Sequence, residues 1–155
     1  MSVLLIEAKE EDIETIWRMQ TEAFRGLYEK YQDTETSPAT ESVGKIKMRF
    51  EMPDSKYYFI KAGNDIVGVI RIINPKDGSL KRISPLWIMN EYRGKGYAQQ
   101  AIREAERMYG SHNWCLDTIL QEEGNIHLYE KMGYKRTGSI MKINDRMDIV
   151  FFEKD

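Results

Sequence analysis

Apolar residues return every three or four positions in some stretches of this chain and form short runs between turn residues in others. The first pattern is that of one face of a helix, and the second is typical of buried strands. Helical spacing predicts helices from Ile13 to Tyr31, from Ser37 to about Glu51, from about Lys95 to Gly110 and from Asn125 to Met132. Ser37 and Pro38 are interpreted as the cap and the first-turn proline of the second helix.

The apolar runs predict the strands. They cover Val3 to Ala8, Tyr57 to Ala62, Ile66 to Ile73, Leu80 to Met89, Trp114 to Leu120, Tyr134 to Ile143 and Arg146 to Glu153. Pro85 interrupts the fourth run, and since proline cannot donate to a ladder it indicates a sheet edge or a bulge there. Interleaved strands and helices over 155 residues predict a single domain, residues 1–155, of the α/β or α+β class on a mixed sheet.

Composition narrows the functional classes. The net charge of −2 gives no global field that would attract nucleic acid or an anionic membrane. No apolar run approaches the roughly 18 residues of a membrane span, and the N-terminus lacks the apolar core of a secretory signal. The lone Cys115 allows no intrachain disulfide, which is typical of a reducing compartment. We therefore expect a cytoplasmic protein without nucleic-acid or membrane partners. No metal site is expected either, because the two histidines, His112 and His127, do not stand at the spacing of metal ligands.

The segment from Arg93 to Ala98, Arg-Gly-Lys-Gly-Tyr-Ala, lies between a predicted strand and the helix that follows it. Glycines allow a sharp turn and a close approach to a ligand. The start of the helix adds unpaired N–H groups and a partial positive charge, a geometry that binds phosphate, and Arg93 and Lys95 add full charges. The segment has neither the Walker nor the Rossmann pattern. An anion site is therefore expected, with a plain basic turn as the alternative.

Two motifs carry a family resemblance. Arg93-x-x-Gly96-x-Ala98 resembles the acetyl-CoA loop of the GNAT superfamily of N-acetyltransferases, and Leu128 to Tyr134 resembles that family's helix-to-strand signature. The motifs stand in the family's order with a strand between them, and the resemblance covers essentially the whole chain. It implies a mostly antiparallel sheet of about seven strands, flanked by about four helices, with a bulged and splayed central strand.

The resemblance also implies an activity, the transfer of an acetyl group from acetyl-CoA to a primary amine by direct attack on the thioester. Backbone N–H groups of the loop would hold the pyrophosphate, and the pantetheine arm would pair with the broken strand as an added strand does. A backbone N–H of that strand would polarise the thioester carbonyl. The residues expected to bind the coenzyme are Leu86, Trp87, Ile88, Arg93, Gly94, Lys95, Gly96, Tyr97, Ala98, Gln99 and Asn125.

Three residues are candidates for the chemistry. Tyr129 matches the tyrosine that many family members place near the coenzyme sulfur, where it would donate a proton to the departing thiolate. Asp117 and Glu122 are the candidates for the base, and a well-solvated amine that needs no base stays open. Glu122 occupies the position at which many relatives carry an asparagine, and Asn125 is the nearest asparagine in this chain.

The sequence leaves several classes of acceptor open. A small-molecule amine and a peptide N-terminus both fit, and Asp33 and Glu35, between the first two helices, would either attract a cationic acceptor or be solvated. The alternatives to an enzyme are a non-catalytic CoA-binding or regulatory module of the same fold and a nucleotide-binding domain unrelated to CoA. A homodimer is left open.

Overall fold

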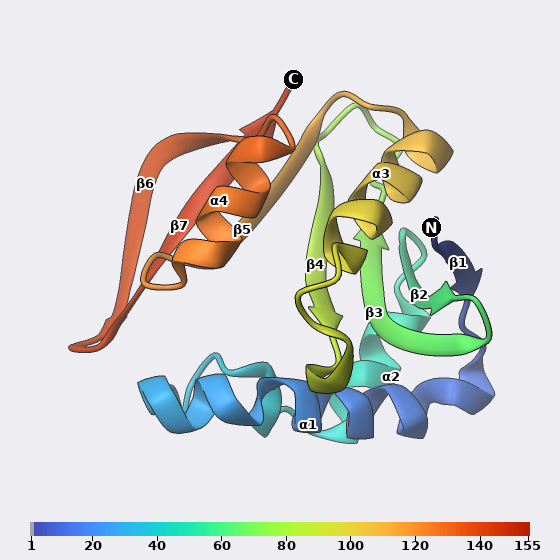
Figure 1. The fold of residues 1–155 in the computed structure, drawn as a ribbon, viewed down its shortest axis with the longest axis horizontal. Helices are drawn as coiled ribbons and strands as arrows, with labels where there is room; N and C mark the ends of the chain where they lie inside the picture. The colour runs from blue at the N-terminus through green and yellow to red at the C-terminus, as the bar shows by residue number, and fades with distance from the viewer. Residues whose placement is uncertain (1) are drawn as a thin grey trace.

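A seven-stranded sheet runs through the computed structural model, which describes residues 2–155 (Figure 1). Its strands lie in the order β1-β2-β3-β4-β5-β7-β6, and every neighbouring pair is antiparallel except β4 and β5. Their bounds are β1 Leu4–Glu7, β2 Ser55–Ala62, β3 Asp65–Ile73, β4 Lys81–Ile88, β5 Trp114–Ile119, β6 Lys135–Asn144 and β7 Met147–Lys154. The expected mixed, mostly antiparallel sheet is confirmed.

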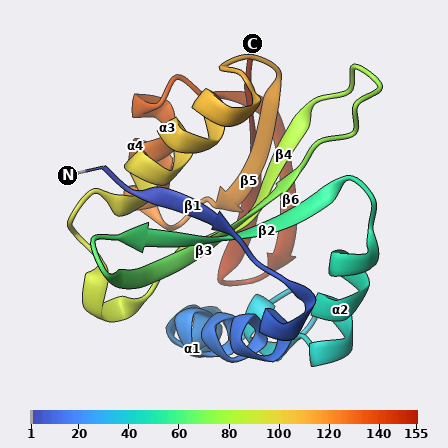
Figure 2. The ribbon, with the colours of Figure 1, turned by 90° about the vertical axis from the view of Figure 1, so that its right-hand side faces the viewer.

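Four α-helices among the described residues cover the two faces of the sheet (Figure 2). They are α1 Ile13–Tyr31, α2 Val43–Glu51, α3 Tyr97–Tyr109 and α4 Glu123–Lys131. The pleat separates two cores, because successive strand residues point to opposite faces. Trp87 packs with α1 and α2, whereas Ile88 packs with α3 and α4. None of the helices within residues 2–155 is both long and apolar enough to cross a membrane.

The second helix begins later than the sequence predicts. Ser37 accepts a hydrogen bond from the Ala39 N–H at 3.2 Å, but it caps only a 3-10 turn, Pro38–Thr40. The backbone is extended at Glu41, and α2 then starts with Ser42 as its cap. Glu41 is held in place by Arg49, which donates to both of its carboxylate oxygens at 2.8 Å. The prediction of one helix from Ser37 is therefore wrong, and residues 32–42 form a loop beside the sheet.

Strand β4 departs from a regular ladder on both sides. Opposite β3, Ile70 pairs with Leu86 and Ile72 with Ile83, so β4 carries an extra residue in the stretch that contains Pro85. Opposite β5, pairing stops after Arg82, and beyond it the two strands diverge (Figure 1). The bulge is thus confirmed, whereas the edge alternative is wrong, since β4 lies in the middle of the sheet. The divergence opens a wedge between β4 and β5.

Candidate active site

A cavity of about 360 Å³ lies between the unpaired side of β4, the start of α3 and the start of α4. Apart from Lys95, every residue predicted to bind the coenzyme lines it. Its full lining is Phe24, Leu27, Leu86, Trp87, Ile88, Tyr92, Arg93, Gly94, Gly96, Tyr97, Ala98, Gln99, Glu122, Asn125, Leu128 and Tyr129. Two sequence motifs that stand about 30 residues apart therefore meet at one site.

The loop before α3 offers free backbone donors to this cavity. Gly94 and Gly96 have φ angles of 80° and 81°, a left-handed conformation that residues with a Cβ rarely adopt. Space around both is open, so the glycines are required by the turn and not by crowding. Within the described part of the chain, the N–H groups from Gly94 to Gln99 have no hydrogen-bond acceptor, and the first N–H that is bonded belongs to Gln100. Such a helix start binds anions.

The Arg93 side chain lines the cavity and also holds the loop in place through hydrogen bonds. Its Nε donates to the Ile88 carbonyl at 2.9 Å, and its Nη2 donates to the Ala23 carbonyl at 3.0 Å. The guanidinium thus ties the loop to the end of β4 and to α1. Lys95 lies outside the cavity lining, with its ammonium 5.9 Å from the centre of the Tyr92 ring. The donors that this loop leaves free toward the cavity are therefore mainly backbone N–H groups.

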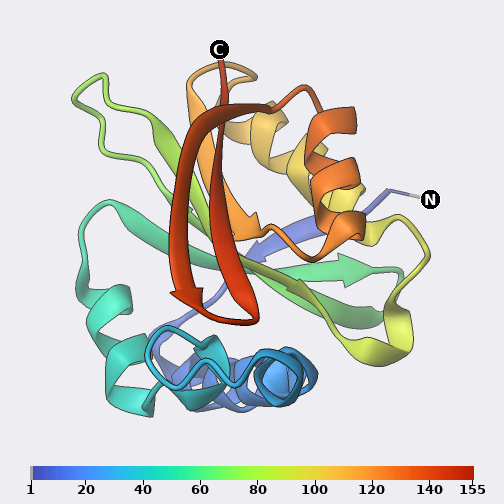
Figure 3. The ribbon, with the colours of Figure 1, turned by 90° about the vertical axis from the view of Figure 1, so that its left-hand side faces the viewer.

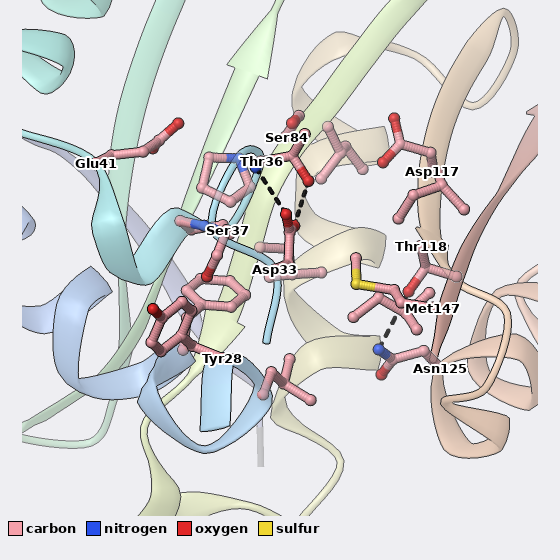
Figure 4. Close-up of a pocket in the computed structure, with 18 of the residues that line it drawn as sticks. Tyr28, Asp33, Thr36, Ser37, Glu41, Ser84, Asp117, Thr118, Asn125 and Met147 are labelled. Atoms are coloured by element: carbon pink, nitrogen blue, oxygen red, sulfur yellow. Dashed lines mark hydrogen bonds between the residues drawn. The ribbon is translucent and has the colours of Figure 1, made fainter. Parts of the chain in front are cut away.

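A second cavity, of about 280 Å³, adjoins the first and is shown in Figure 4. Its walls come from α1, the loop 32–42, α2, the bulged part of β4, β5, α4 and the β6–β7 hairpin. The turn of the β6–β7 hairpin lies beside the end of α1 and the loop that follows it (Figure 3), and Asn144 of β6 donates a 2.9 Å hydrogen bond to the carbonyl of Tyr31, the last residue of α1. Both cavities share the lining residues Phe24, Leu27, Leu86, Asn125 and Tyr129.

Tyr129 lies on α4 where the two cavities meet. Its side chain is buried against Tyr134 and Phe152, with ring centres 6.3 and 5.9 Å away. Burial, reinforced by the nearby Asp117 carboxylate, raises the pKa of Tyr129 to about 12. The phenol is therefore protonated at neutral pH, and no hydrogen bond engages its hydroxyl within residues 2–155. It is a donor available to a ligand at the junction.

The two candidate bases differ in their surroundings. Asp117 lines the second cavity and is hydrogen-bonded to Arg82, at the end where β4 and β5 still pair. Glu122 lines the first cavity, where it accepts hydrogen bonds from the Tyr31 hydroxyl and from Lys30 at 2.9 Å. Burial acts to raise the pKa of Glu122, but these hydrogen bonds and the charge of Lys30 outweigh burial and lower it.

Other lining residues had no signal in the sequence. Thr118 is one of them. Its hydroxyl accepts a 3.2 Å hydrogen bond from Asn125, which the sequence did predict as a site residue, and both residues line the second cavity (Figure 4). Met141, Met147 and Ile149 reach the same cavity from the β6–β7 hairpin. A strand's alternation shows which of its residues share a face, but not which strand will stand beside α1.

Known proteins share this fold. The structure superposes on a spermidine N-acetyltransferase from Vibrio cholerae in complex with CoA and spermine with a TM-score of 0.72, over 97% of this chain and 94% of that one, at 18% identity. That likeness shows the fold.

Two curated relatives from Mus musculus also match. A probable N-acetyltransferase family 8 member 5 is 28% identical over 95 residues, which make up 57% of this chain and 42% of the relative. N-acetyltransferase 8 is 24% identical over 130 residues, 79% of this chain and 55% of the relative. The chain thus spans about half the length of these relatives. The family model of the acetyltransferase (GNAT) family matches residues 13–134, most of the chain. The chain therefore belongs to the GNAT family of N-acetyltransferases.

Proposed function

We propose that this chain transfers the acetyl group of acetyl-CoA to a primary amine that binds in the 280 Å³ cavity. The observation that carries the proposal is the junction of the two cavities at Tyr129, Asn125 and Leu86. One cavity ends in free N–H donors suited to a pyrophosphate, and the other is lined by carboxylates suited to an amine. A donor and an acceptor bound in the two cavities would meet at the tyrosine.

The chain's own groups fit the coenzyme. The N–H groups from Gly94 to Gln99 would hold the pyrophosphate, because a helix start favours negative charge. The side of β4 that faces β5 has no strand partner beyond Arg82 within the described residues. Its backbone groups are free to pair with the amides of a pantetheine arm as a further strand would. The Vibrio cholerae neighbour is described with CoA bound, which supports this assignment.

Acylation forms a C–N bond and breaks the C–S bond. The ammonium loses a proton to solvent before its nitrogen attacks, and the departing thiolate takes a proton from solvent. An alkyl thiol has a pKa of about 8.5, so full proton transfer from Tyr129, with its pKa of about 12, would be uphill by about 5 kcal/mol. Tyr129 therefore acts by donating a hydrogen bond to the sulfur as negative charge develops there. Its high pKa ensures that the donor is present throughout the physiological range.

Asp117 is the carboxylate that we assign to the amine. It lines the acceptor cavity and lies close enough to Tyr129 to affect that residue's pKa. It would accept a hydrogen bond from the incoming ammonium and direct the nitrogen toward the junction. Glu122 is occupied by Tyr31 and Lys30, so we assign it to holding α1 against the start of α4.

The test is release of free thiol from acetyl-CoA, measured across a panel of primary amines. Tyr129→Phe should lower kcat by roughly 10²- to 10³-fold, the usual effect of removing one hydrogen-bond donor to charge that develops in the transition state, with little change in the KM for acetyl-CoA. Tyr109→Phe is the matched control, because its hydroxyl pairs with Tyr58 and lies in neither cavity lining. Full activity in Tyr129→Phe would remove this tyrosine from the mechanism. Tight binding of acetyl-CoA without thiol release from any amine would instead favour a non-catalytic CoA-binding module.

A further inference from the structure

The loop between α1 and α2 directs one acid into the acceptor cavity. Asp33 is only 3% exposed and lines this cavity, at the centre of the side chains drawn in Figure 4. Glu35, two residues later, is exposed and does not line it. The structure thus separates two acids that the sequence left equivalent.

Every hydrogen bond that Asp33 accepts comes from an uncharged donor. Oδ1 accepts the N–H groups of Glu35 at 3.1 Å and Thr36 at 2.9 Å, and Oδ2 accepts the Thr36 hydroxyl. No lysine, arginine or histidine nitrogen within residues 2–155 lies within 4.0 Å of its carboxylate. The other two carboxylates of the lining, Glu41 and Asp117, are paired with arginines. Among the described residues, Asp33 is therefore the acid of this cavity that has no cationic partner.

A buried carboxylate is costly unless a cation offsets it, and uncharged hydrogen bonds offset only part of the cost. The lining contains three carboxylates and one cation, the Arg49 guanidinium, which Glu41 already holds. An entering cation would therefore gain a partner at Asp33, whereas an acceptor with its own carboxylate, such as an amino acid, would be repelled.

The rest of the lining favours a short hydrocarbon chain. It is largely apolar and includes Phe24, Leu27, Ile83, Ile119, Met147 and Ile149. At about 280 Å³ the cavity is near the lower limit of small-molecule sites, which is about 300 Å³. Methylene groups would pack against these side chains while charged nitrogens reach the polar positions.

We infer that the acceptor is a small aliphatic diamine, and that Asp33 binds the ammonium that does not react. This inference rests on the proposed function and names the class of acceptor. The reacting amine would lie at the junction beside Tyr129, and the second nitrogen would lie at Asp33 in the same cavity. Asp33 is then a determinant of specificity, and it takes no part in proton transfer.

The test compares diamines from 1,3-diaminopropane to 1,6-diaminohexane with monoamines of the same length. In the parent, the best diamine should exceed its monoamine in kcat/KM by at least about thirtyfold, the lower end for a buried, hydrogen-bonded charge pair. Asp33→Asn should abolish this preference, so that kcat/KM for the diamine falls to that for the monoamine of the same length. The variant retains Oδ1 to accept the N–H groups of Glu35 and Thr36, so the loop should keep its conformation. Glu35→Gln, a change of the same kind at an exposed site, should keep the preference.

Several results would overturn the inference: equal kcat/KM for diamine and monoamine, a diamine preference that survives Asp33→Asn, or a higher rate with 4-aminobutanoate than with any diamine. If no amine is acetylated, the proposed function fails, and calorimetric titration of the CoA-loaded protein with the same diamines decides the inference separately. Diamine binding by the parent that Asp33→Asn loses would support the subsite without catalysis. Absence of diamine binding to the parent would refute it.

Discussion

Replacing Gly68 with alanine should displace the strand that carries the proposed coenzyme edge. Gly68 lies on β3 and pairs with Ile88 of β4. A Cβ at this position would lie 2.1 Å from the Trp87 carbonyl oxygen and 3.1 Å from the Ile88 Cα. The nearest atoms belong to the backbone, so no change of rotamer can relieve the overlap. The strands themselves must move.

The geometry sets the size of the effect. Cβ atoms in proteins essentially never lie closer than 3.0 Å to another heavy atom. The strands must therefore move apart by about 0.9 Å to lengthen the 2.1 Å contact to that distance. Overpacking costs about 1 to 3 kcal/mol, and because rigid paired strands must absorb the shift, we expect the upper end, about 3 kcal/mol. For a domain of this size that corresponds to a fall in Tm of about 6 to 12 °C.

Thermal unfolding and calorimetric titration with CoA measure the two consequences. Because Trp87 and Ile88 line the coenzyme cavity, Gly68→Ala should also weaken CoA binding by at least about tenfold, equivalent to about 1.4 kcal/mol. The control is Gly26→Ala on α1, where the added methyl group would meet no described atom within 4 Å outside its chain neighbours and the helix's own backbone. Alanine favours helices, so this variant should gain about 0.5 to 1 kcal/mol and bind CoA as the parent does. A Gly68→Ala protein with the stability and CoA affinity of the parent would refute the reasoning.

Two further predictions concern the loop before α3 and the buried tyrosines. Arg93→Lys should lower the unfolding free energy by about 1 to 2 kcal/mol, because one ammonium cannot replace both hydrogen bonds to the Ile88 and Ala23 carbonyls. Lys95→Met is the control and should leave the unfolding free energy within about 0.5 kcal/mol of the parent's. Equal urea midpoints for the two variants would contradict the role of Arg93 in holding the loop. Burial raises the pKa of Tyr129 to about 12 and also raises the pKa of Tyr58 and of Tyr134. Tyrosines of the unfolded chain have a pKa of about 10, so the folded state holds these three protons more tightly than the unfolded chain does. The contribution of these three buried phenols to the unfolding free energy should be complete below about pH 10 and should fall as the pH rises toward about 12. Unfolding free energies, measured with urea, that stay constant from about pH 9 to about pH 11.5 would contradict the raised pKa values.

Much of the fold follows from local features of the sequence. The hairpin at Gly63-Asn64, the strand broken at Pro85 and the glycine turn into α3 are present where predicted, because turn chemistry and backbone preferences act over a few residues. The start of α2 could not be predicted in this way. Ser37 and Ser42 are both competent caps, and the choice between them depends on Glu41, which is held by Arg49 and by Gln20 of α1.

The sequence by itself determined the order of the elements, the family and the loop that offers backbone donors to an anion, because periodicity, turns and motif spacing are local properties. Only the tertiary structure decided what the charged side chains do. Arg93 donates to a carbonyl 70 positions away in the chain, and Glu122 is bound by Lys30, 92 positions away. Asp33 and Glu35 lie in the same loop and could not be told apart from the sequence, but Asp33 is buried in the acceptor cavity whereas Glu35 is exposed. Burial and pairing of charges depend on which distant segments pack together, and local sequence does not contain that information.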